Sequence, residues 1–425
     1  MSSTSPTSTA TAAEELAHGG LRGFRQRTLY TLGKYPDFRV LWLGNVGTML
    51  GQWVQFVAQG WLIFALTGSS FQLGAIALMR GAMYVIVAPF AGAITDRFSR
   101  KSVLVVMTAV SSLSGTVLAV LVLSHTISVW MLYVTATVDG LAESVNQPAR
   151  QVMIYDVVGS EDLPNGIAVN SLGANTMRIV GPALGGALIG VAGVGAAFVL
   201  QAVSYLFSSF ATSRIKTRGE PGGHHSASVV ESMADGIRYA RHHPDVRLLI
   251  LMSALPSILV YPYVSFIPVF AEDVLHSGSA GYGFLASAVG YGSIIGAVLA
   301  ANFSGVKKRG QILVWTTFIY MALVTLFALS NIYALSFGLL VVAGIANSVY
   351  LMFNQVMIQL VVDDDYRGRV LSLYVMVSGI TPFAAFLMGA LITVFGPQIT
   401  VACFTGVAAS IALVIGITSR RLREI

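Results

Sequence analysis

Apolar residues run along the chain in long stretches that short polar or glycine-rich turns separate. An α-helix needs about 20 apolar residues to cross a bilayer, and windows of that size predict twelve helices. These lie at 38–66, 71–95, 102–124, 129–156, 165–192, 195–213, 246–271, 281–303, 311–330, 332–361, 370–394 and 397–418. The stretches are too long and continuous for the strands of a barrel. The pattern therefore predicts an all-α membrane protein.

Composition agrees with this fold class. Charged residues make up 10% of the 425 residues, against about 25% in an average soluble domain. So little charge suits a lipid bilayer as the main partner and excludes a disordered chain. The single cysteine, Cys403, rules out an internal disulfide and a cysteine metal cluster. We expect no metal site and no cofactor, because the histidines near 224 and 242 have no carboxylate or cysteine at ligand spacing.

The basic residues indicate the orientation in the membrane. With twelve spans both chain ends lie on one side, and 23 of the 25 Lys and Arg residues fall there, including Arg150. The positive-inside rule makes that side the cytoplasm. We therefore expect a multi-pass protein of the bacterial inner membrane with both termini cytoplasmic. The net charge of +6 then reflects topology and not a nucleic-acid partner.

The second half of the chain repeats the first. At an offset of 204, ten of the twenty positions from 139 to 158 are identical, and the run Gln-Val-Met-Ile occurs in both copies. We predict a cytoplasmic tail, a six-helix bundle, a cytoplasmic linker, a second six-helix bundle and a tail, at 1–37, 38–213, 214–245, 246–418 and 419–425. Two pseudo-repeat bundles that rock about a shared site are typical of secondary transporters.

Two short motifs carry a family resemblance. The turn after the second span contains Gly92, Asp96, Arg97, Arg100 and Lys101, and it resembles the loop motif of the major facilitator superfamily. The fifth span contains Gly181, Pro182, Gly185 and Gly186, which resemble the helix-packing antiporter motif of drug exporters in that superfamily. The resemblance covers about residues 38–418. The turn at 67–70 and the run at 367–370 before the eleventh span resemble the branch of that superfamily that contains enterobactin and drug exporters. Together the resemblances imply the major facilitator fold and an exporter role.

The loop motif suggests a latch on the cytoplasmic side. Asp96 and Arg97 lie where one helix ends and the next begins. A carboxylate there can pair with a neighbouring cation in one conformation and release it in another. The alternative is that these residues only cap a helix and mark the topology.

Four ionisable residues lie deep within predicted spans, namely Arg80, Asp139, Glu143 and Arg178. A charge at the centre of a membrane helix costs at least about 2.5–3.5 kcal/mol, so each needs a partner or water. Their depths predict two pairs, Arg80 with Asp139 and Glu143 with Arg178. The aligned positions of the second half are neutral, which favours ion coupling or contact with a charged substrate in the first half. A purely structural network is the alternative.

Polar residues in three spans mark a candidate substrate cavity. In the superfamily that the sequence resembles, spans one, four, seven and ten line the central cavity. The candidates in spans one, seven and ten are Asn45, Gln52, Gln55, Gln59, Tyr261, Tyr263, Asn347 and Asn354. For each amide the alternative is a hydrogen bond between helices.

Together these features favour a secondary active transporter that exports an amphipathic small molecule, drug- or siderophore-like, by alternating access with proton antiport. The sequence has no nucleotide-binding glycine-rich loop, so we expect neither an enzyme nor an ATP-driven pump. We expect a monomer whose partners are a small-molecule substrate and protons. Two alternatives stay open: an importer or facilitator of an anionic small molecule on the same fold, and a non-transporting membrane sensor or partner subunit.

Overall fold

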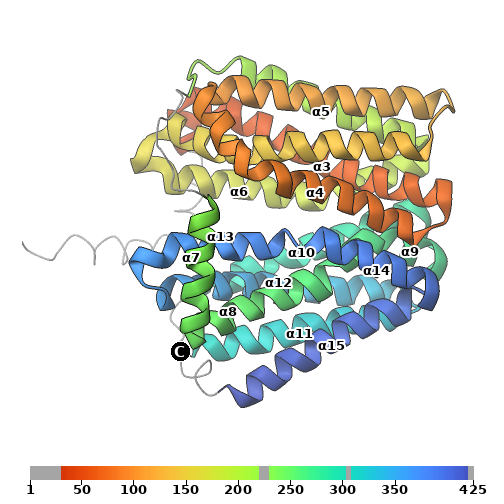
Figure 1. Cartoon of the computed structure of the whole chain (residues 1–425). Coiled ribbons are helices and arrows are strands. Elements are labelled where there is room, and N and C mark those ends of the chain that lie inside the picture. Colours follow the sequence, from red (N-terminus) through yellow and green to blue (C-terminus); the bar gives the residue numbers. More distant parts are fainter. Residues whose placement is uncertain (1–29, 220–228, 303–307, 420–425) are drawn as a thin grey trace, which may run out of the picture.

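The computed structural model describes residues 30–219, 229–302 and 308–419, and every element in these ranges is helical. Figure 1 shows two helical bundles packed side by side. The first bundle consists of α3 (Pro36–Thr67), α4 (Ser70–Arg97), α5 (Arg100–Leu123) and α6 (Val129–Ser213). The linker helix α7 (Val229–His242) precedes the second bundle. That bundle contains α8 (Pro244–Leu255), η1 (Pro256–Val260), η2 (Tyr261–Phe266), α9 (Ile267–Val269), η3 (Phe270–Val274), α10 (Gly278–Asn302), α11 (Arg309–Leu329), α12 (Tyr333–Val361), α13 (Asp364–Ser378), α14 (Thr381–Phe395) and α15 (Pro397–Thr418).

Helix α6 is three helices in sequence. Its 85 residues are interrupted at Gly159 (φ 73°, ψ 176°) and Gly193 (φ 82°, ψ 168°), in a left-handed region that glycine enters without a steric penalty. Both breaks fall in predicted turns between spans. Nine helices of the described ranges are long and apolar enough to cross a membrane, with α6 counted once. The three segments of α6 and the broken pair α13–α14 make the arrangement consistent with twelve spans.

The two halves repeat each other in three dimensions as well as in sequence. A methyl group on Gly140 would lie 2.3 Å from the carbonyl oxygen of Arg80, and one on Gly344 would lie 2.4 Å from the carbonyl oxygen of Val289. The offset of 204 aligns Gly140 with Gly344, and Val289 is the approximate counterpart of Arg80 in the second half. Each half therefore uses one glycine to bring two helices into backbone contact.

The predicted span at 246–271 is the least regular one. It is built from α8, η1, η2, α9 and η3, and it includes π-helical and 3₁₀ turns. Pro256, Pro262 and Pro268 lie in this stretch. Proline has no backbone N–H and clashes with the preceding turn, so it interrupts the regular hydrogen-bond ladder. The irregular stretch carries Tyr261 and Tyr263.

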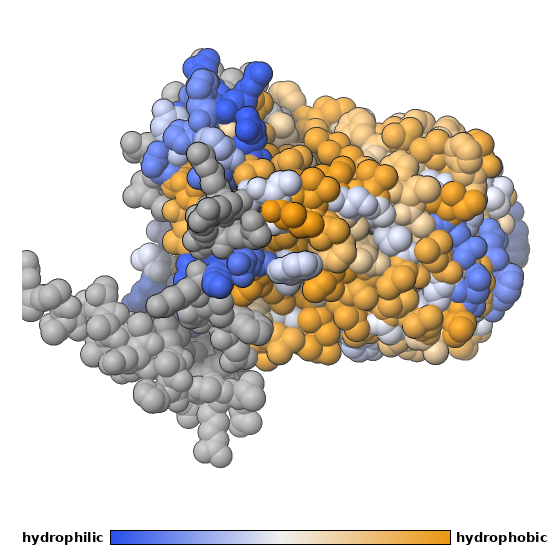
Figure 2. Space-filling model, turned by 90° about the horizontal axis from the view of Figure 1, so that it is seen from below, coloured by the Kyte–Doolittle hydropathy of each residue, from blue (hydrophilic) through white to orange (hydrophobic). Residues whose placement is uncertain are grey.

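The outer surface is that of a membrane protein. Large apolar side chains such as Ile86, Trp130 and Leu326 are exposed along the helices, whereas soluble monomers rarely expose large contiguous apolar patches. On the face shown in Figure 2, hydrophobic residues form a broad band between two hydrophilic ends. We call the end at which α4 meets α5 the basic end, and the end at which α3 meets α4 the far end.

The bundles meet along two helix pairs, α4 with α14 and the middle segment of α6 with α10. A methyl group on Gly74 would lie 2.8 Å from the carbonyl oxygen of Ala385, and one on Gly186 would lie 2.6 Å from the Cα of Gly283. Glycine allows these close approaches. Gly74 is near the start of α4 and Gly186 is near the break at Gly193, so both contacts lie toward the far end.

The linker helix α7 is fastened to the second bundle at the basic end. The Tyr239 hydroxyl donates to Asp363 Oδ2 at 2.9 Å, and the Tyr239 and Tyr366 rings stack with centroids 4.4 Å apart. Asp235 and Arg369 form an ion pair at 3.2 Å. Burial raises the pKa of Tyr239 above its usual value, so this hydroxyl keeps its proton and stays a donor.

Candidate functional site

Asp139 occupies a buried polar site in the first bundle. It lies in the first segment of α6 and is 3% exposed. Its Oδ2 accepts hydrogen bonds from Gln55 Nε2 of α3 and, at 3.1 Å, from Ser114 Oγ of α5. Its Oδ1 has no hydrogen-bond partner among the described residues. A buried carboxylate oxygen without a donor is unusual, and it is an atom at which a proton can bind.

Arg80 of α4 is the cation that acts electrostatically on Asp139. Its charge acts on the Asp139 carboxylate, and the close contact at Gly140 holds the Arg80 backbone against the neighbouring turn of α6. In the described structure no ion pair within 4.0 Å joins the two side chains. The structure thus brings the predicted pair together as neighbours, without a direct salt bridge.

The predicted pair of Glu143 and Arg178 is wrong. The guanidinium of Arg178 lies over the ring of Trp53 in α3, 5.9 Å from its centroid, and no acid of the described chain lies within 4.0 Å of it. Similar depth in the membrane fixes the height of a residue but not the direction in which it leaves its helix. The two residues lie on different segments of α6, and their side chains have different neighbours.

Arg150 is a buried charge that was expected at the membrane surface. It is 3% exposed and donates a hydrogen bond to Asn146 Oδ1, one turn earlier in α6. Its Nε and Nη1 have no partner among the described residues, and Glu143 is the carboxylate whose charge acts on it. The first segment of α6 continues for nine residues, about 14 Å, beyond Arg150. The spacing of seven from Glu143, two helical turns, was the signal that could have revealed it.

Most of the predicted cavity amides join helices and do not line an open space. Gln59 donates to the Leu132 carbonyl oxygen at 3.3 Å, and Gln55 donates to Asp139. Asn45 and Asn354 are likewise buried. Their hydrogen bonds run from Asn45 Nδ2 to Asn170 Oδ1 at 3.0 Å and from Asn354 Nδ2 to Ser253 Oγ at 2.6 Å.

Three predicted residues behave differently from those amides. Gln52 and Tyr261 are partly exposed, and the Tyr261 hydroxyl donates to Asn347 Oδ1 at 3.0 Å. Tyr263 is fully buried, yet its hydroxyl has no partner among the described residues. A buried hydroxyl without a partner is costly, so this group is a candidate donor to a ligand.

The loop motif takes part in contacts within the first bundle at the basic end. Arg100 Nη1 lies 2.8 Å from Asp156 Oδ2, close to the break at Gly159. Lys101 Nζ donates to the carbonyl oxygen of Ile215 at 2.6 Å, at the start of the linker. Asp156 was not among the predicted site residues, although it is the carboxylate that pairs with this motif.

The rest of the predicted latch is only partly visible. Arg97 is exposed at the end of α4. Gly92 and Asp96 lie in the same helix, but the surroundings of Gly92 and the side chain of Asp96 fall outside the described residues. The latch therefore stays a prediction.

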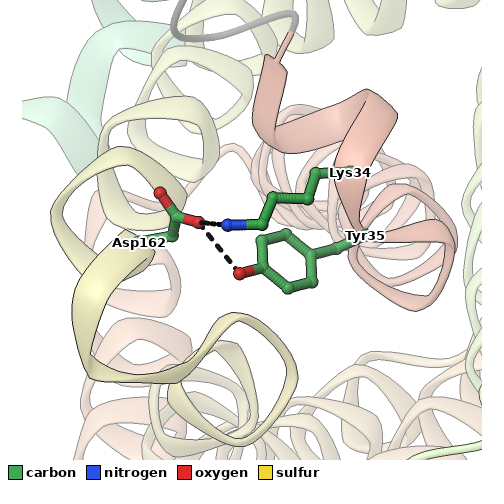
Figure 3. A network of polar contacts seen from close by, with 3 residues as sticks. All are labelled: Lys34, Tyr35 and Asp162. Atoms are coloured by element: carbon green, nitrogen blue, oxygen red, sulfur yellow. Dashed lines mark hydrogen bonds and ion pairs between the residues drawn. The ribbon is translucent and has the colours of Figure 1, made fainter.

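A second ion pair at the basic end joins the segment just before α3 to α6 (Figure 3). Asp162 Oδ2 accepts from Lys34 Nζ at 2.7 Å and from the Tyr35 hydroxyl at 2.9 Å. The hydrogen bond to Asp162 raises the pKa of Lys34 above its usual value. This contact also was not predicted, because its members are far apart in sequence and lie in expected loops.

The glycines of the antiporter-like motif lie at two helix contacts. A methyl group on Gly181 would lie 2.5 Å from the Cβ of Trp53, and one on Gly185 would lie 3.4 Å from the Cα of Val54, so both face α3. Gly186 instead faces α10 of the other bundle. Pro182 is buried between them. The motif therefore lies where the middle segment of α6 packs against α3 of its own bundle and against α10 of the second bundle.

Comparisons with known proteins identify the family to which this chain belongs. The sequence matches the family model described as a transmembrane secretion effector over residues 33–424. The chain belongs to this family of major facilitator transporters. The resemblance expected from the two motifs is thereby confirmed, as are the all-helical membrane fold and the expectation that the protein is not an enzyme.

The curated relatives are transporters with low sequence identity. The chain is 24% identical to the staphyloferrin A transporter of Staphylococcus aureus, over 82% of this chain and 87% of the relative. It is 24% identical to the enterobactin exporter EntS of Escherichia coli, over 81% and 82%. It is 21% identical to the macrolide efflux protein A of Streptococcus pyogenes, over 79% and 84%. Two of these three relatives are named as an exporter and an efflux protein, and the chain is similar to them.

Solved structures show the same fold. A bacterial homologue of the lysosomal transporter Spinster, described as inward-facing and occupied, aligns with a TM-score of 0.70 and 16% identity, over 91% of this chain and 97% of that chain. A bacterial homologue of the iron transporter ferroportin, described as inward-facing, aligns with a TM-score of 0.67 and 15% identity, over 90% and 97%. At these identities the likeness shows the fold alone.

Proposed function

We propose that this protein exports an amphipathic small molecule in exchange for protons, from the bacterial inner membrane and with both termini in the cytoplasm. Two of the relatives described above are named as an exporter and an efflux protein, which supports the outward direction. The observation that carries the proton coupling is the buried site of Asp139, with one hydrogen-bonded and one unpartnered oxygen.

The position of Arg80 supports a link between that proton and the movement of the bundles. Arg80 lies on α4, one of the helices that pack against the second bundle. Rocking of the bundles at this seam shifts α4 relative to α6, and with it the cation that acts on Asp139. A carboxylate binds a proton more readily when a nearby cation withdraws. Proton binding and release would therefore follow the alternating movement.

The contacts between the bundles support a direction for the state described. They run from the far end, at Gly74 and Gly186, to about the middle of the span, where Gly81 of α4 meets Pro382 of α14 and Gly290 meets Arg178. If the basic end faces the cytoplasm, this state is closed to the outside and open inward, ready to take substrate from the cytoplasm. The similar Spinster and ferroportin homologues are described as inward-facing too.

The test is gradient-driven transport in proteoliposomes of the purified protein, with a panel of amphipathic drugs and siderophores. We expect an imposed pH gradient to drive uphill transport in the wild type and in Glu272→Gln, which removes an exposed carboxylate at the far end. Asp139→Asn should lose the uphill transport and keep substrate exchange at equal concentrations, because the isosteric amide preserves packing but cannot exchange a proton. Full gradient-driven transport by Asp139→Asn would refute the proposed coupling.

The same assay separates the alternatives on this fold. If the wild-type substrate flux does not depend on the pH gradient, this would favour a facilitator. Uphill movement in the opposite direction, in vesicles of known orientation, would favour an importer.

A further inference from the structure

Arg178 differs from the other buried arginines of the first bundle in its surroundings. Arg80 acts on Asp139, and Arg150 lies within the electrostatic reach of Glu143. The groups on which Arg178 acts are tyrosine hydroxyls of the second bundle. In the part of the chain that the structure describes, no carboxylate forms an ion pair with it.

The balance of buried charges points the same way. Asp156 and Asp162 of α6 are paired with Arg100 and Lys34 at the basic end. Deeper in α4 and α6, three buried or half-buried arginines accompany two carboxylates, Asp139 and Glu143. With each carboxylate assigned to the arginine on which it acts, one positive charge remains, and it belongs to Arg178. An unpaired cation is unfavourable within a membrane and marks a functional position by default. An anion that enters with the substrate would complete the balance.

Arg178 is also placed where a substrate can reach it. It lies about midway between the α6 breaks at Gly159 and Gly193, near the middle of the span. A methyl group on Gly290 of α10 would lie 3.1 Å from the Arg178 carbonyl oxygen, so the residue lies where the two bundles meet. Its side chain is only partly buried. Sites at the interface of two transporter repeats, near the membrane midplane, are where substrates bind.

Aromatic groups from both bundles are within the electrostatic reach of this cation. The Trp53 ring of α3 lies 5.9 Å from the guanidinium. The charge of Arg178 also acts on the hydroxyls of Tyr261, Tyr263 and Tyr320 of the second bundle. The Tyr261 hydroxyl is occupied by Asn347, whereas the buried Tyr263 hydroxyl has no partner among the described residues. A cation, a free hydroxyl donor and flat apolar rings together suit an aromatic or amphipathic acid.

Resting on the proposed export function, we propose that the transported molecule carries an anionic group, which Arg178 binds at the seam of the two bundles. The Tyr263 hydroxyl donates a further hydrogen bond to the same group, and Trp53 packs against the apolar part of the molecule. A carboxylate, sulfonate or phenolate would satisfy this chemistry. A cationic amphiphile would instead meet an uncompensated positive charge.

Three fluorescent probes test the charge preference directly. Dansylglycine, dansylamide and dansylcadaverine share one fluorophore and carry a negative charge, no charge and a positive charge. Their binding to the purified protein in lipid nanodiscs is measured by fluorescence titration, and their transport in proteoliposomes. We expect dansylglycine to bind about ten-fold more tightly than dansylamide, and dansylcadaverine to bind most weakly, as for a charge-assisted contact.

Matched variants identify the residue responsible. Arg178→Gln should remove the preference for dansylglycine, and Arg178→Lys should keep part of it, because lysine keeps the charge but not the planar fork. Arg247→Gln removes an exposed arginine of α8 and should leave the preference unchanged. Since loss of a buried charge can affect folding, binding by Arg178→Lys keeps the test valid if Arg178→Gln is unstable.

The outcomes separate this proposal from the proposed function. Equal affinity for the three probes, or an unchanged preference in Arg178→Gln, would overturn the anionic site, while proton-driven transport of any of them would leave export standing. Binding of dansylglycine that depends on Arg178, without any transport, would support the site and refute the export function.

Discussion

At the residue scale, neutral polar groups and an aromatic ring contact the buried charges of this transporter, and no direct salt bridge joins these charges in the described structure. Asp139 has two neutral donors on one oxygen and none on the other. Arg150 is held by an amide on its own helix, and Arg178 by an aromatic ring. Direct salt bridges instead occur at the basic end, where Lys34 and Arg100 each meet an aspartate of α6.

The Lys34 contact gives a prediction on pH. A lysine whose pKa is raised on folding contributes stability that is fully present below its unfolded pKa, about 10.5, and lost as the pH rises through the folded value. Lys34→Met should therefore lower the Tm of the purified protein, by the same amount at about pH 7 and about pH 9. Lys308→Met, an exposed change at another loop, should have no such effect. A deficit that disappears by pH 9 would contradict this assignment.

At the scale of elements, glycines decide how closely the helices approach and therefore which side chains meet. Gly140 sets α6 against α4, and Gly344 sets α12 against α10 in the same way. The contact is common to both halves, but only in the first half does it place a cation, Arg80, beside a carboxylate, Asp139. The repeat supplies the scaffold, and the first half adds the charges.

This difference predicts unequal effects of equal changes. Gly140→Ala and Gly344→Ala each force a methyl group against a carbonyl oxygen, and overpacking of this kind costs about 1–3 kcal/mol. Both should lower the Tm by a similar amount. Only Gly140→Ala should also weaken proton-driven transport relative to substrate exchange, because only it displaces Arg80 from Asp139. Gly338→Ala, on α12 with open space around it, serves as the control. Equal loss of coupling in both variants would contradict the assignment to the first half.

At the scale of the whole molecule, the two bundles pack against each other through small residues near the far end. Gly186 and Gly283 are in backbone contact there, and Gly74 meets α14. Contacts between glycines are close but have no interlocking side chains, so they can part and re-form as the bundles rock. The far-end seam is thus suited to open and close.

A larger side chain in this seam should shift the molecule toward the opposite state. Gly186→Val would hold the far end apart and so close the basic end. Pulsed electron paramagnetic resonance between spin labels at the exposed positions Arg97 and Arg247, on opposite bundles at the basic end, should then report a shorter distance. Gly190 is one turn further along α6, and a methyl group there would be 3.4 Å from Ser279 Oγ. Gly190→Val should therefore change the distance between the labels less. An unchanged distance in Gly186→Val would contradict the rocking motion.

Much of the fold could be predicted from the sequence, because a membrane helix must be long and apolar throughout. The breaks at Gly159 and Gly193 fall in expected turns, and the repeat aligned Gly140 with Gly344, which make matching contacts. The irregular helix around Pro256 and Pro262 was not foreseen in detail. It depends on how the freed backbone groups find partners in the folded bundle.

The site was harder to predict than the fold. Depth along a span gives the height of Glu143 and Arg178 but not the side of the helix from which each extends, and so their pairing was wrong. Arg150 was hidden among the basic residues that mark topology. The amides of α3 share a stripe, yet Gln55 and Gln59 are used by other helices. A stripe of polar residues indicates a buried polar face and cannot distinguish a cavity from a helix contact.

The central claim is that a single buried carboxyl group of the first bundle binds the exchanged proton. Infrared spectroscopy of the protein in lipid, titrated with pH, tests it most directly, because a protonated carboxyl group absorbs apart from a carboxylate. We predict a band of a buried protonated carboxyl group that grows as the pH falls, that Asp139→Asn removes, and that Glu143→Gln and Glu272→Gln leave in place. A band that persists in Asp139→Asn, or that disappears in Glu143→Gln, would contradict the account.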